Sequence, residues 1–263
     1  MKTLALAIII ITTLSYNVVI AQEIKTLRTM PQKAFKKGEK LTFTVNYGFV
    51  HAGEAVIEVL NEEKKIGNRD VYHIVGTGRS KNTFDFFFKV RDRYETYLDK
   101  DAIVPWLFLR RIEEGSYKLS QNVLFNHYTD VAKSGTKDIK TPNNIQDLVS
   151  TYYYARCTDF TNAKVNEVHT LQAFLDDEIF TFSYKFLGRE TITTNLGTFK
   201  CLKFCPTLLK GRVFKREDDM TLWVTDDENK LPIRAEAKII VGSVKMDLAK
   251  YEGVANPINK IIK

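Results

Sequence analysis

The chain has 263 residues, of which 44% are hydrophobic, and a formal net charge of +7 at pH 7. Its lysines and arginines are scattered and alternate with acidic residues, and without a dense basic block the composition does not favour a nucleic-acid-binding protein. Its length suits one large all-β domain with a hydrophobic core.

Residues 1–21 have the pattern of a secretory signal peptide. Lys2 provides a basic start, Leu4–Ile11 form an apolar run, and Val19 and Ala21 are the small residues expected before a cleavage site. Polar residues interrupt the run well before it reaches the roughly 20 apolar residues of a membrane-spanning helix.

Cleavage after Ala21 would remove Lys2, lower the net charge from +7 to +6 and leave residues 22–263 as one domain. Cysteine does not follow the cleavage point, so we do not expect a lipid-anchored lipoprotein or a membrane span in the mature chain. The predicted location is the periplasm, with full secretion as the alternative.

Alternation of apolar and polar residues predicts β-strands along most of the chain. In the first strand, Leu41, Phe43 and Val45 share one face, as is typical of a half-buried antiparallel sheet. A corner is expected over residues 48–53, because the glycines at both ends permit unusual backbone angles.

The same alternation predicts a strand over residues 83–99, with Phe84, Phe86 and Phe88 on one face. Further turns are expected from glycine, asparagine and aspartate signals. They fall at Gly67-Asn68, Glu114-Gly115, Ser134-Gly135, Gly188, Asn195–Gly197, Asp226-Asp227 and Gly242.

One segment predicts a helix, from Asn144 to Cys157. Ile145, Leu148, Val149 and Tyr152 follow the spacing of an amphipathic helix face. We expect capping by Thr141, Asn143 or Asn144. The predicted fold is therefore mainly β: one large curved antiparallel sheet, either a half-barrel or a barrel-like sandwich, with one amphipathic helix packed on it.

Three cysteines leave the disulfide state open. Cys201 and Cys205 are four strand steps apart, about 13 Å, whereas a disulfide needs Cα atoms within about 7 Å. A bridge would have to join Cys157 to one of them. The alternative is three reduced thiols.

Several separated segments resemble the DUF3108 family of exported bacterial proteins. They are Phe35–Ala55, Phe84–Asp99, Pro105–Gly115, Ile145–Arg156 and Leu222–Leu248. The resemblance implies an exported protein without an assigned activity. The motif W-x-T-D-x-x-x-x-L-P, from Trp223 to Pro232, also resembles envelope lipoprotein carriers, whose half-barrel sheets hold acyl chains.

Catalytic and metal-binding patterns are weak. The histidines are far apart, and the acidic triplets at 176–178, 217–219 and 226–228 lie beside predicted turns, so we expect no metal, no cofactor and no enzymatic activity.

Aromatic residues suggest a binding site for an apolar or amphipathic, lipid-like ligand between the sheet and the helix. Its candidate residues are Tyr47, Phe84, Phe86, Phe88, Trp106, Tyr152 and Trp223. The alternative is an adaptor that docks another envelope protein through strand edges or the 48–53 corner, with Phe49, Val50 and His51 as candidates.

Overall fold

The computed structural model describes residues 25–207, 216 and 218–261, and the predicted signal peptide lies outside them. The described residues form sixteen strands in one antiparallel sheet. The strands of the first half are β1 (Lys40–Tyr47), β2 (Val50–Val59), β3 (Lys64–Ile66), β4 (Arg69–Ser80), β5 (Arg91–Asp99), β6 (Pro105–Glu114), β7 (Tyr117–Asn126), β8 (Val131–Ser134) and β9 (Lys137–Lys140). Those of the second half are β10 (Val168–Leu175), β11 (Glu178–Thr194), β12 (Gly197–Pro206), β13 (Met220–Thr225), β14 (Pro232–Lys238), β15 (Ser243–Glu252) and β16 (Lys260–Ile261).

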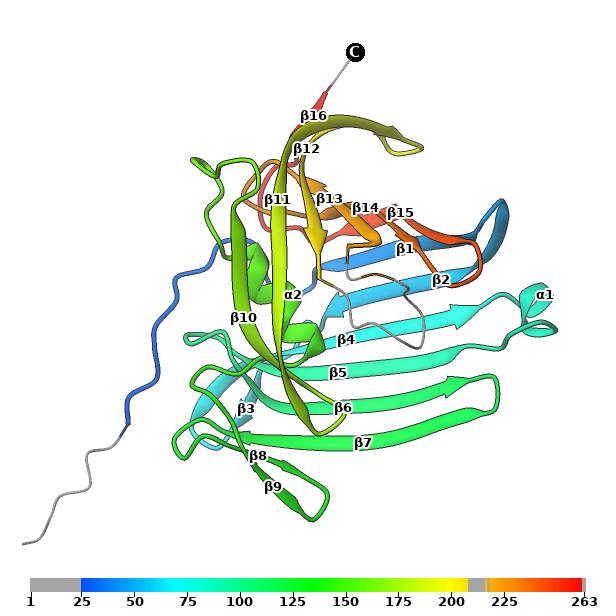
Figure 1. The fold of residues 1–263 in the computed structure, drawn as a ribbon. Helices are drawn as coiled ribbons and strands as arrows, with labels where there is room; N and C mark the ends of the chain where they lie inside the picture. Colours follow the sequence, from blue (N-terminus) through cyan, green and yellow to red (C-terminus); the bar gives the residue numbers. More distant parts are fainter. Residues whose placement is uncertain (1–24, 208–215, 217, 262–263) are drawn as a thin grey trace, which may run out of the picture.

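The sheet is continuous and strongly curved. Its strand order is β10-β11-β12-β13-β14-β15-β1-β2-β4-β5-β6-β7-β8-β9, with β3 paired to β4 and β16 to β12. The middle of this order joins the two halves of the chain, because β1 pairs with β15. The predicted curved antiparallel sheet is confirmed, and the strands bend around a central space (Figure 1).

Side chains connect the two ends of the sheet, where the strands themselves do not pair. Asp176 and Asp177 form the turn between β10 and β11. Asp176 accepts a hydrogen bond from Arg110 at 2.6 Å, and Asp177 forms an ion pair with Lys137 at 2.8 Å. These contacts bring the β10–β11 turn against β6 and β9, which gives the open sheet its barrel-like shape.

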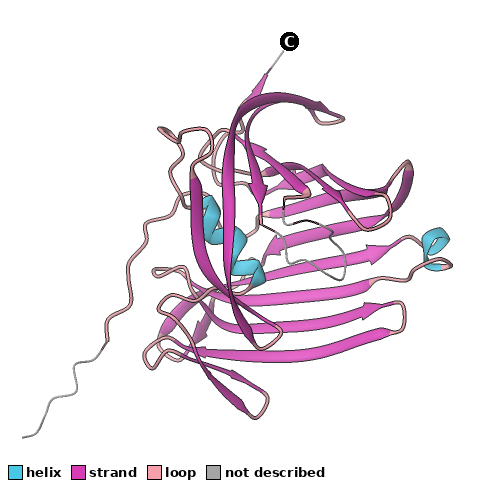
Figure 2. Cartoon of the chain, viewed as in Figure 1, coloured by secondary structure: helices cyan, strands magenta, loops and turns pink. Residues whose placement is uncertain are grey.

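Within the described ranges, two helices interrupt the strands: α1 (Asn82–Asp85) and α2 (Leu148–Arg156) (Figure 2). The longer one, α2, contacts β5 on one side and β10 on the other, so the sheet wraps around it. Among the described residues, no helix combines the length and hydropathy needed to cross a membrane.

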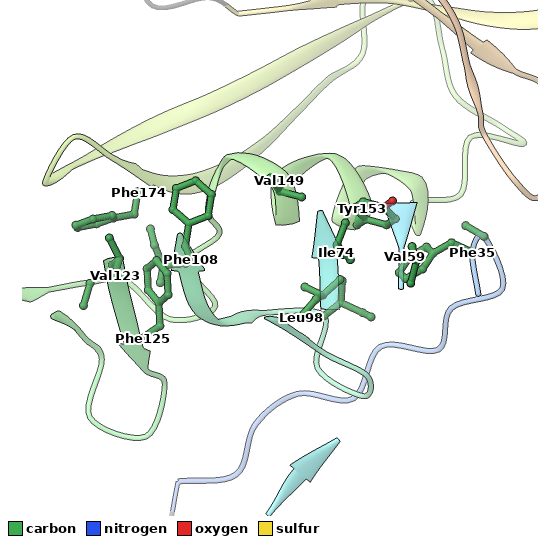
Figure 3. Close-up of a cluster of buried hydrophobic side chains, with 14 residues drawn as sticks. Phe35, Val59, Ile74, Leu98, Phe108, Val123, Phe125, Val149, Tyr153 and Phe174 are labelled. Carbon is green, nitrogen blue, oxygen red and sulfur yellow. The ribbon is translucent and has the colours of Figure 1, made fainter. Parts of the chain in front are cut away.

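The largest buried cluster lies between α2 and the strands β2 to β7. Val149 and Tyr153 of α2 face Ile74, Leu98 and Phe108 of the sheet (Figure 3). Burying these side chains stabilises the helix position, because each contributes about 1.5–3 kcal/mol of hydrophobic free energy.

The predicted helix over Asn144–Cys157 is present, but its predicted start is wrong. Asn144 has a left-handed backbone angle, φ 58°, and the helix begins only after Asp147. Ile145 is buried as expected, but it precedes the helix, and Leu148 is exposed. Neither Thr141, Asn143 nor Asn144 is the cap.

The 48–53 corner is tighter than predicted. β1 and β2 are joined by the two residues Gly48 and Phe49, and Gly48 has φ 56°. Gly53 lies inside β2 instead, where a Cβ would be 2.4 Å from the carbonyl oxygen of Arg79. This second glycine is therefore required by the close approach of β4 and not by a turn.

Gly188 also lies within a strand and not at the predicted turn. The register between β11 and β12 shifts between Phe186 and Gly188, and Gly188 has φ 115°. A bulge of this kind bends a strand without ending it, so β11 continues for 17 residues. The other predicted turns lie between strands, as expected.

Candidate functional site

The site begins with the way α2 is fixed at its N-terminus. The Asp147 carboxylate accepts a hydrogen bond from the Ser150 backbone N–H, and the Ser150 hydroxyl accepts one from the Asp147 N–H, both at 2.7 Å. This capping box satisfies two amides that the first turn leaves unpaired. Thr96 of β5 also donates to the Asp147 carboxylate. Burial raises the pKa of Asp147 to about 6.

The C-terminus of α2 is fixed by a buried arginine. Arg156 donates to both carboxylate oxygens of Glu39, at 2.5 and 2.7 Å, and to the carbonyl oxygens of Ala34 and Asn229, at 2.7 and 2.8 Å. Burial opposes its charge, but the nearby Tyr152 and Glu39 more than offset that and raise the pKa of Arg156. The helix is therefore held at both ends by buried polar groups.

An apolar cavity of about 290 Å³ lies between α2 and the strands β11 to β13. The helix supplies Tyr152 and Ala155 to its wall, and Phe160 follows the helix. The remaining wall is formed by Leu148, Thr151, Arg156, Phe180, Phe182, Tyr184, Phe204, Pro206, Met220, Leu222, Val224 and Lys230.

Strand alternation explains why these side chains face the cavity. On β11, Phe180, Phe182 and Tyr184 stand on one face because successive strand residues point to opposite sides. Phe160, Tyr184 and Phe204 pack against one another, with Tyr184 edge to face on both phenylalanines and ring centroids 4.9–6.2 Å apart. Our sequence analysis missed this wall, although the alternation in "EIFTFSYKF" would have indicated it.

A second cavity of about 350 Å³ adjoins the first, and Tyr152, Met220 and Leu222 line both. It extends over the inner face of β1, β2, β4 and β5. Burial raises the pKa of Asp92 in its wall to about 6 and that of Tyr94 to about 12. Both raised pKa values favour the protonated, uncharged side chain, as is typical of groups in a weakly polar environment.

Two cations are part of the first cavity's wall, Arg156 and Lys230. The Arg156 guanidinium already forms an ion pair with Glu39. The ammonium of Lys230 contributes to lowering the pKa of nearby Asp159, after that carboxylate's hydrogen bonds with Thr161. The cavity thus has an aromatic and aliphatic wall to which the side chains of two basic residues also contribute.

The predicted ligand-binding residues fall in three places. Among the described residues, Tyr152 is the one member of that set that lines the two cavities. Trp106 donates to Asp99 at 2.8 Å and packs on His127. Trp223 points to the opposite face of β13 from Leu222, where it donates to Glu190 at 3.1 Å.

The other four aromatics gather at the far end of the sheet. Tyr47 lies at the end of β1, with its ring centroid 6.3 Å from that of Phe84. Phe86 and Phe88 are exposed. The structure therefore brings Tyr47 and Phe84 together, but outside the cavities.

The predicted strand through Phe84–Phe88 is wrong. This segment forms α1 and the following turn, and β5 begins only at Arg91. Asp85 accepts a hydrogen bond from Arg91 at 2.5 Å, and the Ser80 hydroxyl accepts one from the Val90 N–H at 2.8 Å. These polar contacts close the loop between β4 and β5 and override the strand propensity of the phenylalanines.

The acidic triplets have structural contacts. Asp176 and Asp177 are paired with basic residues, and Asp226 accepts a hydrogen bond from Arg189 at 3.0 Å. The Asp227 carboxylate accepts one from the Asn229 N–H at 2.9 Å. Glu217 lies outside the described residues. Within the described ranges, no group of three potential ligands could hold a metal ion.

All three cysteines are unpaired in the described part of the chain. Cys201 and Cys205 lie on β12, as predicted, and Cys157 is the C-cap that follows α2. Burial raises the pKa of Cys157 to about 11 and that of Cys201 to about 12. A raised pKa disfavours the reactive thiolate form at both positions.

A comparison with solved structures found matches that include one that shares this fold at low sequence identity and two of weaker structural similarity. A beta-barrel-like protein of domain of unknown function DUF1849 from Brucella abortus has 10% identity and a TM-score of 0.52, over 87% of this chain and 99% of that one. A candidate lipoprotein from Parabacteroides distasonis has 12% identity and a TM-score of 0.35, over 87% and 100% of the chains. A candidate exported protein with a YmcC-like fold from Bacteroides fragilis has 11% identity and a TM-score of 0.34, over 86% and 100%.

A comparison with curated proteins found no match. A family model does match, over residues 42–249, which include the strands β2 to β14 that surround α2 and both cavities. The chain therefore belongs to DUF3108, a family of proteins of unknown function.

Proposed function

We propose that this protein is a non-enzymatic exported protein of the bacterial envelope that binds an apolar or amphipathic ligand beside α2. The observation that carries this proposal is the cavity between α2 and β11–β13, with its aromatic and aliphatic wall. Ligand sites in proteins are mostly apolar hollows of about 300–1,000 Å³ with a few polar groups. The two adjoining cavities, of about 290 and 350 Å³, lie in this range when taken together.

A ligand with a flexible acyl chain suits this shape. Each CH₂ transferred from water to such a wall contributes about 0.8 kcal/mol. Tyr152, Met220 and Leu222, which line both cavities, would contact the middle of a chain that extends from one into the other. Export to the envelope is supported by the signal-peptide pattern of residues 1–21.

Lys230 favours a ligand with an anionic group. Its side chain lines the first cavity, and its ammonium would attract the carboxylate or phosphate of a bound ligand. We expect a fatty acid to bind more tightly than its methyl ester, and Lys230→Gln to reduce that difference. An equal affinity for the acid and the ester in the unmodified protein would contradict this role for Lys230.

A cavity-filling substitution tests the site itself. Ala155 faces the first cavity from α2, so Ala155→Trp should occupy space that the ligand needs. We expect fluorescence titration with a fluorescent fatty acid to show at least tenfold weaker binding. The control is Ala249→Trp, which is the same substitution at an exposed position on β15, away from the cavity. Unchanged binding by a folded Ala155→Trp protein would contradict the site.

The alternative prediction, an adaptor that docks another envelope protein, stays a prediction. Its candidate residues Phe49 and Val50 are exposed, and the His51 ring contacts the carbonyl oxygen of Gly53 at 3.0 Å. These residues lie at the β1–β2 turn, away from α2 (Figure 1).

A further inference from the structure

Several turns meet at the end of the sheet that lies away from β3. The β1–β2 turn, α1 and the β14–β15 turn lie at the right of Figure 1, with the β6–β7 turn below them. The Tyr47 hydroxyl donates to the carbonyl oxygen of Val241 at 2.9 Å. A Cβ at Gly115 in the β6–β7 turn would be 3.1 Å from the Phe88 ring, so Phe88 reaches this turn. We call this group of turns the tip.

Large apolar side chains protrude from the tip into solvent. The exposed fraction is 108% for Phe49, 89% for Phe86 and 79% for Phe87. Phe88, Val50, Ile240 and Val241 are exposed as well. Exposed phenylalanines that cluster on neighbouring turns are unusual for a surface that meets only water, and they indicate an interaction site.

Basic residues lie directly behind these apolar side chains. Residues 79–91 contain Arg79, Lys81, Lys89 and Arg91 against the single carboxylate of Asp85. A hollow of about 620 Å³ is lined by Arg79, Lys81 and Arg91, together with His51 and Glu54.

A second hollow, of about 690 Å³, continues along β4 to β7. Arg79 and Arg91 line it too, and Arg93, Arg111 and Lys118 extend it. Its carboxylates are Asp92 and Glu113, and Glu113 is paired with Lys89 at 2.9 Å. Gly78 and Asp92 line both this hollow and the second cavity, and Arg79 beside Gly78 is exposed.

We propose that the tip docks this protein on an anionic lipid membrane. Phenylalanines on short turns can enter the boundary between headgroups and acyl chains, while basic side chains behind them meet the phosphates. The apolar residues occupy the ends of separate turns and the cations form a rim behind them. This arrangement, with apolar side chains in front and basic side chains behind, complements the surface of an anionic membrane. The proposal does not depend on a ligand in the cavities.

Vesicle flotation tests the apolar part. The purified protein should bind vesicles of phosphatidylethanolamine and phosphatidylglycerol, and the double variant Phe86→Ser/Phe87→Ser should bind at least tenfold more weakly. Both side chains are exposed, so the fold should be unaffected. The control is Val165→Ser/Val168→Ser, because these residues are exposed outside the tip. Equal binding by both double variants would overturn the proposal.

Charge reversal tests the basic part. Near an anionic surface each basic residue contributes about 1 kcal/mol, which is about fivefold in partitioning. Arg79→Glu and Lys81→Glu should each lose at least this factor, whereas Lys140→Glu on β9 should lose little. Vesicles of phosphatidylcholine alone, or high salt, should remove the difference. If the protein does not bind vesicles, or if the tip variants lose only a protein partner, a membrane role is excluded.

Discussion

The guanidinium of Arg156 and the carboxylate of Glu39 form a buried pair with both side chains almost inaccessible, at 2% and 0% exposure. Glu39 immediately precedes β1, and Arg156 is the last residue of α2. The pair therefore ties the helix to the middle of the sheet, across 117 residues of chain. It fixes the face of α2 that bounds the proposed ligand cavity.

Glu39→Gln should destabilise the protein by about 3–5 kcal/mol. The substitution leaves the Arg156 charge buried without its counter-ion, which is more costly than removing an exposed pair. Urea unfolding measures this change in the free energy of unfolding. The matched control is Glu252→Gln, which removes an exposed pair with Lys250 and should cost about 0–1 kcal/mol. Equal losses in the two variants would contradict the anchoring role.

The raised pKa of Asp147 should make the free energy of unfolding depend on pH. Burial raises its folded pKa to about 6, compared with about 3.9 when unfolded. The folded state therefore keeps this proton at pH values where the unfolded state has lost it. Stability should fall as pH rises from about 4 to about 6, by up to about 3 kcal/mol, and should then level off.

Asp147→Asn should flatten this slope, because the amide does not titrate and asparagine is also a good helix cap. Chemical unfolding at a series of pH values provides the measurement. Asp138→Asn, at an exposed carboxylate, should leave the slope unchanged. Asp92 contributes a slope of the same sign in every variant, since burial also raises its pKa to about 6. A slope that persists fully in Asp147→Asn would be inconsistent with a buried, protonatable cap.

Substitutions at Tyr153 can distinguish the contribution of ring packing to stability from that of the hydroxyl group. Its ring is fully buried, 4.6 Å from the Phe35 ring centroid, and its hydroxyl has no hydrogen-bond partner among the described residues. Tyr153→Phe should leave stability unchanged or raise it by about 1 kcal/mol, because a buried unpaired polar group is removed. Tyr153→Ala should cost about 3–5 kcal/mol. Thermal unfolding of both variants tests this order, and a large loss in Tyr153→Phe would reveal a missing partner.

Thiol counting tests the cysteine assignment. Denatured, unreduced protein should react with three equivalents of a thiol reagent, because all three cysteines are unpaired in the described structure. In the native protein Cys201 should react slowest, since it is buried and its pKa is raised to about 12. A single reactive thiol would instead indicate a bridge that includes Cys157.

Much of the fold could be predicted because half-buried strands alternate visibly, as at Leu41, Phe43 and Val45. The start of α2 was not predicted correctly, because Thr141, Asn143 and Asn144 are plausible caps by residue type and the local Asp147–Ser150 capping box was not recognised. The segment around Phe84, Phe86 and Phe88 was predicted as a strand for a different reason. These residues have strand propensity, but the Asp85–Arg91 pair closes the connection between β4 and β5 there, and the alternation of apolar residues does not reveal such a pair.

The candidate site could be predicted only in part. Tyr152 was identified because the helix was expected to lie on the sheet. Phe182 and Tyr184 were missed, although their alternation was visible, because nothing in one strand says which face will meet the helix. The same holds for β13, where Leu222 lines the cavity and the predicted candidate Trp223 lies on the opposite face.

Native mass spectrometry of protein isolated gently from its own envelope tests the proposed ligand site most directly. We expect a population heavier than the bare chain by the mass of a lipid or another amphipathic molecule, which dissociates on activation. The Ala155→Trp variant should lose this population, and Ala249→Trp should keep it. A bare mass in all three proteins, together with an experimental structure in which side chains fill the cavity, would contradict ligand binding.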